Sequence, residues 1–289
     1  MIPASFGYQR PATLEEALSL LERHGEDAKL LAGGHSLLPV LKARLARPGV
    51  LIDIARIPGL SGVTKTAGGL RLGALTTHHE VESSPLVREA CPLLAEAAGR
   101  IGDVQVRNRG TLGGSAAHAD PAADYPAALL ALEAVMVAAG PGGARNIPAA
   151  EFFTGPYESA LKPSEILTAV EVPSPPRGSG GAYLKAAQQA SGFAVCGVAA
   201  RVTLGPDGNV ASARVGVTGV AAPPYRARRA EEALAGRPTT PENLRAAAAL
   251  AAEGVDPLDD FHASAEFRVQ LAKVYTERAL AEAVRRAKA

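Results

Sequence analysis

Two glycine-rich turns contain the residues best suited to chemistry in this sequence. They read Ala32-Gly33-Gly34-His35-Ser36 and Gly110-Thr111-Leu112-Gly113-Gly114-Ser115. Glycine adopts positive φ and lets the backbone approach a ligand closely, so consecutive N–H groups can converge on phosphate oxygens. Ser36, Thr111 and Ser115 could donate further hydrogen bonds. Either turn alone is better explained as a plain tight turn, but the pair favours a site for both phosphates of a pyrophosphate.

The elements around the first turn predict a strand, a glycine turn, a helix and a second strand. An apolar run at 28–32 precedes the turn, and apolar residues at helical spacing follow it from Leu37 to Leu45. A helix opening at Leu37 would add its N-terminal N–H groups to an anion site. The run 50–54 is predicted to be a buried strand. Neither turn matches the G-x-G-x-x-G or P-loop pattern, so those nucleotide-binding fingerprints are absent.

Further along the chain, the pattern predicts elements that would frame the two turns. Thr13 and Glu16 form a predicted capping box for a helix that ends at Gly25. The other predicted elements are a hairpin (63–65 and 70–72), a helix (85–98), an apolar stretch after the second turn (126–139) and a strand (166–172). The Pro/Gly/Ser-rich segment 173–181 is a predicted linker and domain boundary. Beyond it, strands at 182–187, 193–204 and 210–220 precede helices at 226–235, 241–253 and 265–287, which predicts an α+β domain with helices on one face of an antiparallel sheet.

Composition narrows the function. The hydrophobic fraction is 47%, the charged fraction 20% and the net charge +1, so we expect neither nucleic acid nor an anionic membrane surface as a partner. We expect no secretory signal, no transmembrane segment and a cytoplasmic location. The two cysteines, Cys91 and Cys196, favour buried free thiols over a disulfide and are too few for an iron–sulfur cluster. The six histidines lack the pairing of a zinc site, so no metal site is predicted and any redox centre would be organic.

Three segments together resemble a known family. They are Lys29–Pro39 (KLLAGGHSLLP), Gln105–Ser115 (QVRNRGTLGGS) and Ala117–Pro126 (AHADPAADYP). They are similar to the pyrophosphate-binding loops of the FAD-binding medium subunit of aerobic carbon monoxide dehydrogenase and its xanthine dehydrogenase relatives, and the resemblance covers essentially the whole chain. It implies an FAD-binding domain of the vanillyl-alcohol-oxidase type over residues 1–175, built of two α/β subdomains at about 1–56 and 57–175. An α+β C-terminal flavoprotein domain at 176–289 would complete an α+β protein.

The resemblance also implies roles for individual residues. The first FAD cradle would comprise Lys29, Leu30, Leu31, Ala32, Gly33, Gly34, His35, Ser36 and Leu37. The second would comprise Gly110, Thr111, Gly113, Gly114 and Ser115. Asp124 would accept from ribityl or ribose hydroxyls, with a helix cap as the alternative. The walls would include Ile101, Val106, Ala117, Ile166 and Leu167, each of which could equally be core.

Three more residues are implied to lie near the flavin. Lys185 would stabilise anionic reduced flavin electrostatically, with a solvated strand lysine as the alternative. Phe193 would lie against the isoalloxazine ring or in the core, and Thr77 would contact the flavin. The pair His78 and His79 is interpreted as a helix-start and packing feature, and no chemistry is assigned to His118.

The implied function is an FAD-carrying electron-transfer subunit of a molybdenum hydroxylase, with no catalytic residue of its own. Its partners would be an iron–sulfur small subunit and a molybdopterin large subunit, assembled as a dimer of heterotrimers. The complex would lie in the cytoplasm, or at the inner membrane face through those partners. A quinone or NAD would be the external acceptor. Carbon monoxide is the first expected substrate and a purine or N-heterocycle the second, because Gln188–Gly192 departs from xanthine dehydrogenase relatives. A stand-alone flavin oxidase and a non-redox nucleotide- or protein-binding module are the alternatives.

Overall fold

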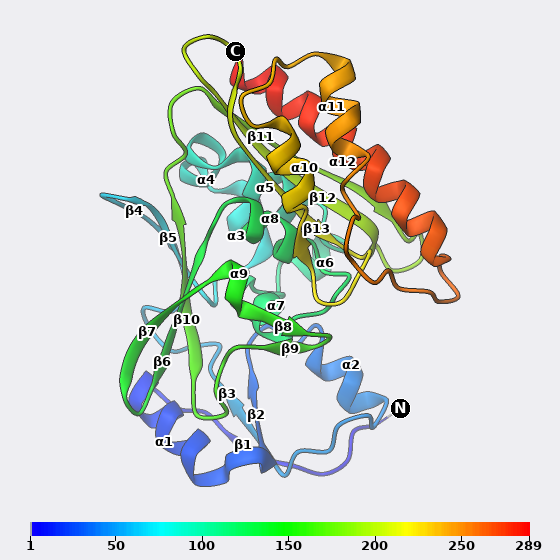
Figure 1. Cartoon of the computed structure of the whole chain (residues 1–289). Helices are drawn as coiled ribbons and strands as arrows, with labels where there is room; N and C mark the ends of the chain where they lie inside the picture. Colours follow the sequence, from blue (N-terminus) through cyan, green and yellow to red (C-terminus); the bar gives the residue numbers. More distant parts are fainter. Residues whose placement is uncertain (1) are drawn as a thin grey trace.

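The computed structural model describes residues 2–289, and the first of its sheets lies at one end of the molecule (Figure 1). Its order is β1-β3-β2 with all strands parallel. The elements are β1 (Gly7–Gln9), α1 (Leu14–His24), the 3₁₀ helix η1 (Gly25–Asp27), β2 (Ala28–Leu31), α2 (Leu37–Lys42) and β3 (Val50–Asp53). The strand, glycine turn, helix and strand predicted around the first turn are therefore present, with a helix shorter than expected.

The ends of α1 follow from local chemistry. Thr13 caps the helix by accepting from the N–H of Glu16, and Gly25 ends it with φ +53°. The predicted capping box is wrong in one respect, because the Glu16 carboxylate accepts from the N–H of Ala12 at 2.7 Å. Ala17, Leu20 and Leu21 are buried against β3, which explains the helical spacing of the apolar residues.

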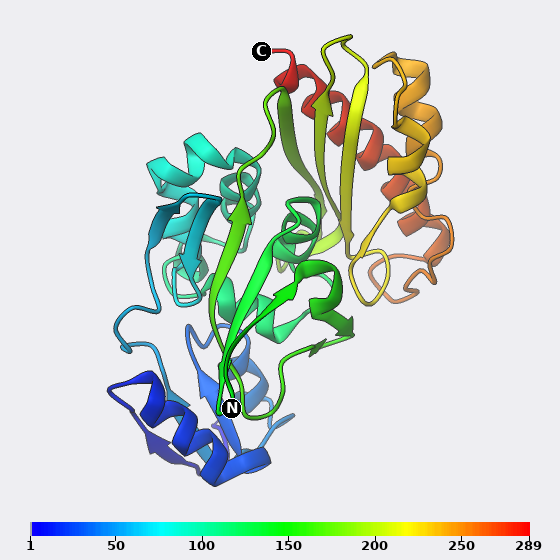
Figure 2. The same ribbon diagram turned by 60° about the vertical axis from the view of Figure 1, so that its left-hand side comes forward.

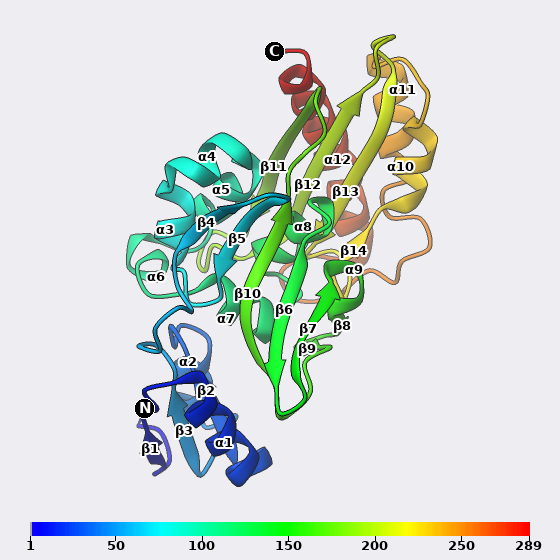
Figure 3. The ribbon, with the colours of Figure 1, turned by 90° about the vertical axis from the view of Figure 1, so that its left-hand side faces the viewer.

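The second sheet is antiparallel throughout, with the order β4-β5-β10-β6-β7. In Figure 3, the helices drawn in cyan lie to the left of this sheet. Its strands are β4 (Val63–Thr66), β5 (Gly69–Gly73), β6 (Val135–Gly140), β7 (Gly143–Pro148) and β10 (Ile166–Pro173). The associated elements are α3 (His78–Ser83), α4 (Pro85–Ala90), α5 (Pro92–Gly99), α6 (Val104–Arg107), α7 (Leu112–His118), α8 (Asp124–Ala131), α9 (Ala149–Phe152) and the hairpin β8 (Phe153–Gly155) with β9 (Glu158–Ser159).

Two predicted elements of this region are divided in the structure. The single helix expected over 85–98 is two helices, because Cys91 leaves the helical conformation before Pro92, whose ring disfavours α geometry in the preceding residue. The apolar stretch 126–139 comprises most of α8, a turn and most of β6. The turn between them places Glu133 in the left-handed region with φ +55°.

The C-terminal sheet is also antiparallel, with the order β11-β12-β13-β14. Its elements are β11 (Ser179–Ala187), β12 (Ala194–Leu204), β13 (Val210–Thr218), β14 (Tyr225–Arg226), α10 (Arg228–Leu234), α11 (Pro241–Ala248) and α12 (Ala265–Ala287). The long α12 packs along β11 and β12, as Figure 2 shows. The α+β class expected from the sequence is confirmed, with helices of this region packed on the sheet.

The other face of the C-terminal sheet is covered by α8 from the preceding region. Gly216 permits this contact, because a methyl carbon at Gly216 would lie 2.1 Å from the carbonyl oxygen of Ala127. Alternate residues of β12 consequently face different cores: Ala199 packs with α8, whereas Val198 and Ala200 pack with α12. The N-terminal and C-terminal regions are therefore packed together without an intervening gap along α8.

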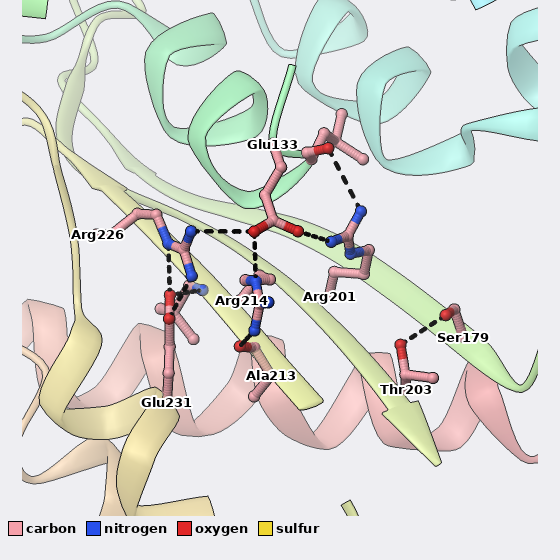
Figure 4. Close-up of polar contacts among 10 residues, drawn as sticks. Glu133, Ser179, Arg201, Thr203, Ala213, Arg214, Arg226 and Glu231 are labelled. Carbon is pink, nitrogen blue, oxygen red and sulfur yellow. Dashed lines mark hydrogen bonds and ion pairs between the residues drawn. The ribbon is translucent and has the colours of Figure 1, made fainter. Parts of the chain in front are cut away.

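Glu133 joins these two regions through the charge cluster in Figure 4. Its carboxylate contacts Arg201 at 2.6 Å, Arg214 at 2.8 Å and Arg226 at 3.3 Å. Arg226 also pairs with Glu231, which accepts from the N–H of Val215 at 2.8 Å. Although partial burial opposes it, contact with the arginines holds the pKa of Glu133 below its ordinary value. This cluster fixes the turn after α8 to strands β12, β13 and β14.

Within residues 2–289, no helix is both long enough and apolar enough to cross a lipid bilayer.

Candidate functional site

The two glycine turns border a single cavity of about 540 Å³. They touch through their backbones: a methyl carbon at Gly33 would lie 2.1 Å from the carbonyl oxygen of Arg109 and 2.8 Å from the Cα of Gly110. Only a glycine at position 33 allows this approach. One ligand can therefore contact both turns at once, which is the relationship that a shared diphosphate requires.

The first turn offers a row of free backbone donors. The N–H groups of Gly33, Gly34, His35 and Ser36 have no protein acceptor within residues 2–289. Gly34 has φ +77°, which a residue with a side chain rarely adopts. His35 Nδ1 lies 3.0 Å from the carbonyl oxygen of Gly33 and steadies the turn. Consecutive unpaired N–H groups need an acceptor, and phosphate oxygens would supply it.

The second turn uses its N–H groups within the protein, which differs from the expectation. Leu112 donates to the carbonyl oxygen of Thr76 at 2.9 Å, and Gly113 donates to that of Ala74 at 2.8 Å. The N–H of Gly114 donates to Thr111 Oγ1, the N-cap of α7, at 3.1 Å. The missing side chain of Gly113 is explained by packing, because a methyl carbon there would lie 2.4 Å from the Cβ of Ala74. This turn contributes close packing and hydroxyls more than backbone donors.

Asp124 begins α8, and its carboxylate is buried at the cavity wall. Its Oδ1 accepts from the Tyr183 hydroxyl at 2.6 Å and from Lys185 Nζ at 2.7 Å. Both contacts are to Oδ1, and within the described chain no side chain donates to Oδ2. This second oxygen is therefore left for a ligand hydroxyl. Burial raises the pKa of Asp124, and Lys185 and Tyr183 oppose that shift. The N-cap of α8 is Ala123, so Asp124 is not the helix cap considered as an alternative.

Lys185 lies beside the cavity without lining it. Its side chain is 4% exposed, so it is not a solvated strand lysine. Besides the pair with Asp124, Nζ donates to the carbonyl oxygens of Arg100 at 2.6 Å and Gly192 at 2.7 Å. An ammonium group has three donors, and all three are used. These contacts let Lys185 join α8, the end of α5 and the 188–193 loop, and its implied role in stabilising anionic reduced flavin stays a prediction.

Most of the residues expected at the site line this cavity. They are Lys29, Leu30, Ala32, Gly33, Gly34, His35, Ser36, Leu37, Ile101, Val106, Gly110, Thr111, Gly113, Gly114, Ser115, Ala117, Asp124, Ile166, Leu167 and Phe193. Leu31, Thr77 and Lys185 are not among the lining residues. Thr77 instead caps α3 in a capping box with Glu80 and forms an antiparallel bridge with Thr111. Its hydroxyl is used there, which argues against a flavin contact.

Several lining residues were not expected from the sequence: His78, Asp120, Tyr157, Glu165 and Ser191. The two adjacent histidines diverge, because His78 is buried and His79 is exposed. Tyr157 enters through the β8–β9 hairpin, where φ is +59° and its N–H donates to the carbonyl oxygen of Ala119 at 3.1 Å. A lone tyrosine in a hairpin has no sequence signal that could have identified it. The two cysteines are buried and free, as predicted.

Comparison with known proteins defines the class. Residues 4–175 match the family described as the FAD binding domain in molybdopterin dehydrogenase, and residues 181–283 match the CO dehydrogenase flavoprotein C-terminal domain. The protein is therefore an FAD-binding flavoprotein, and its cofactor is FAD. The chain belongs to the family of FAD-binding medium subunits of molybdenum hydroxylases of the carbon monoxide dehydrogenase and xanthine dehydrogenase type.

Relatives match over their whole length. The carbon monoxide dehydrogenase medium chain of Hydrogenophaga pseudoflava is 42% identical over 281 residues, which cover 97% of both chains. The 6-hydroxypseudooxynicotine dehydrogenase complex subunit alpha of Paenarthrobacter nicotinovorans is 40% identical over 288 residues, covering 100% of this chain and 97% of that protein. A solved structure of the H. pseudoflava carbon monoxide dehydrogenase superposes with a TM-score of 0.96 at 43% identity, covering 99% of each chain. The chain is thus an oxidoreductase subunit.

Proposed function

We propose that this chain collects electrons from iron–sulfur clusters on a partner small subunit and passes them to an external quinone or NAD. A molybdopterin large subunit would oxidise the substrate in the same complex, which would be located in the cytoplasm. With a quinone as the acceptor, the complex would lie at the inner face of the membrane. The contact between Gly33 and Arg109 supports this proposal most directly, because it brings both glycine turns to one cavity, as a shared FAD diphosphate would require. The full-length similarity to proteins named as a medium chain and a complex subunit supports the partners.

The residues that would hold FAD follow from their free donors and acceptors. The N–H groups of Gly33–Ser36 would bind the diphosphate, and Asp124 Oδ2 would accept from a ribose or ribityl hydroxyl. Ile101, Val106, Ile166 and Leu167 would form apolar walls that exclude water. FAD bound there supplies a centre that takes up electrons singly and releases them in pairs.

Carbon monoxide is the proposed substrate of the complex, and an N-heterocycle is the second candidate. The second is favoured by the nicotine-derived substrate in the name of a relative that is 40% identical over the whole chain. The carbon monoxide dehydrogenase medium chain is similar to the same degree, at 42% identity. The cavity would not discriminate between these substrates, because the substrate would be oxidised on the large subunit.

The test uses the complex purified with its partner chains under anaerobic conditions. Carbon monoxide, a pyridine such as nicotine, and a purine such as xanthine are added separately, and the visible flavin absorbance is followed. Bleaching with one substrate identifies it and supports electron delivery to this chain. The isolated FAD-loaded chain should stay oxidised with every substrate. If the isolated chain is reduced directly by a small alcohol, the stand-alone oxidase interpretation replaces the subunit proposal.

A further inference from the structure

His78 is a buried side chain of the cavity to which the proposed function gives no role. It begins α3, its side chain lines the cavity, and the residue is 4% exposed. Its backbone N–H donates to the carbonyl oxygen of Gly110 at 3.0 Å, so the backbone of His78 is joined to the second glycine turn. A buried polar ring normally has a partner for each of its nitrogens.

Tyr125 determines which nitrogen of His78 carries the proton. Tyr125 is 0% exposed, and in the described chain its hydroxyl has one partner, His78 Nδ1 at 3.2 Å. The buried phenol must donate its proton to an acceptor, and Nδ1 can accept only when the imidazole proton is on Nε2. Burial, with contributions from His35 and Arg107, lowers the pKa of His78 to about 4. The ring is therefore a neutral imidazole with an Nε2–H donor at pH 7.

The Nε2 atom lies over the bare Cα of Gly110. A methyl carbon at Gly110 would lie 2.5 Å from Nε2, and both residues line the cavity. Between residues 2 and 289, Nε2 makes no hydrogen bond with a protein acceptor. His35, on the first turn, is close enough to affect the titration of His78. The free donor therefore lies where the two turns meet.

We propose that His78 is a cofactor-binding residue whose Nε2–H donates to the diphosphate of FAD at the second glycine turn, with Tyr125 positioning the imidazole. This donor compensates for the N–H groups of Leu112 and Gly113, which are bound to Thr76 and Ala74. Because the imidazole is neutral, it adds a hydrogen bond without adding a charge. The inference rests on the proposed placement of the diphosphate between the two turns.

The first experiment measures FAD and ADP affinity of the full chain by flavin fluorescence quenching and calorimetry. His78→Leu should weaken both ligands by the same factor, about 10- to 100-fold, because one hydrogen bond to a charged group is lost. His78→Gln keeps an N–H donor and should recover most of the affinity. Tyr125→Phe removes the hydroxyl that selects the Nε2–H tautomer and should weaken FAD and ADP binding by less than about tenfold. His79→Gln, at the exposed neighbour, is the matched control and should bind as wild type.

A second measurement keeps the proposal testable if His78→Leu does not fold. Nitrogen NMR of the wild-type chain with labelled histidine should show the Nε2–H tautomer at neutral pH and a shift of Nε2 on adding ADP. A charged ring, an Nδ1–H tautomer, unchanged affinity in His78→Leu, or a loss for FAD without one for ADP would overturn the proposal. Wild-type chain that fails to bind FAD would instead overturn the proposed function.

Discussion

The backbone of Gly33 lies directly against the backbone of Arg109, and a single added methyl carbon would meet the Arg109 carbonyl oxygen at 2.1 Å. Gly33 belongs to the first glycine turn and follows strand β2, whereas Arg109 follows helix α6 and immediately precedes the second glycine turn. Their contact makes one binding surface out of two segments that are far apart in the sequence.

Gly33→Ala should therefore separate the turns. Forcing a methyl group into this contact costs about 1–3 kcal/mol, and we expect FAD affinity to fall roughly 10- to 100-fold. Fluorescence titration of the refolded, cofactor-free chain measures the change. Gly68→Ala is the control, because nothing lies within 4 Å of a methyl carbon at that hairpin glycine. FAD binding by Gly33→Ala at wild-type strength would show that the diphosphate lies elsewhere.

Lys185→Met tests whether Lys185 joins protein segments or contacts the cofactor. The variant leaves the Asp124 carboxylate buried without its cation, so the free energy of unfolding of the cofactor-free chain should fall by about 3–5 kcal/mol in urea. FAD affinity should fall as a consequence, since Asp124 and the 188–193 loop lose their common contact. Lys65→Met is the control, because Lys65 lies on the exposed strand β4, and it should change neither the free energy of unfolding nor FAD affinity. A variant with wild-type stability and lost FAD affinity would favour a direct flavin contact.

Stability should depend on the titration of His78. The folded state holds the pKa of His78 near 4, compared with 6.5 for an ordinary histidine, chiefly through burial. Between these values the unfolded chain binds more protons, so the free energy of unfolding should decrease as the pH falls from 6.5 toward 4. The loss should approach roughly 3 kcal/mol. Urea unfolding of cofactor-free wild type and His78→Gln gives the difference, and an equal pH dependence in both would contradict the assignment.

The cluster around Glu133 should contribute more than an ordinary surface pair. Glu133→Gln leaves Arg201, Arg214 and Arg226 facing a neutral amide, and we expect a loss of about 1–2 kcal/mol because the cluster is only partly solvated. The exposed pair of Arg229 and Glu232 at 3.7 Å is the comparison, and Glu232→Gln should change stability by less than about 0.5 kcal/mol. Equal effects of the two substitutions on stability would show that the cluster contributes no more than an ordinary surface pair. Thermal unfolding at low and high salt makes the measurement.

The two thiols should be unreactive in the folded chain. Burial raises the pKa of both Cys91 and Cys196 to about 12, so at pH 8 only about one in ten thousand is a thiolate. A colorimetric thiol reagent should label neither until denaturant is added, and should then label both. The single variants Cys91→Ser and Cys196→Ser assign each reaction. Rapid labelling of the native chain would contradict the buried position of the thiol concerned.

Sequence patterns predicted elements well where neighbouring residues determine them. The helix Ala265–Ala287 has the predicted bounds, and Thr13 caps α1 as expected. Prediction failed where a single residue changes the chain direction. Pro92 divides the predicted helix at 85–98, and Glu133 occupies a left-handed turn that would ordinarily suggest glycine or asparagine.

The site shows the same division between local and distant determinants. The first turn could be identified because its donors are contiguous in the sequence. The hydrogen bonds made by the Leu112 and Gly113 N–H groups could not be predicted, because their acceptors, Thr76 and Ala74, lie on a distant segment. Lys185 matched the family pattern, yet its contacts with Arg100 and Gly192 depend on how α5 and the 188–193 loop meet in three dimensions.

Helix α8 has consequences for how the chain unfolds. Asp124 at its first residue binds Tyr183 and Lys185 of β11, and Glu133 just beyond its last residue binds arginines of β12, β13 and β14. Neither end can detach while the C-terminal sheet remains in place. The FAD-binding half and the C-terminal half should therefore melt in one cooperative transition, and each ligand that tightens the cavity should raise the melting temperature of the entire polypeptide.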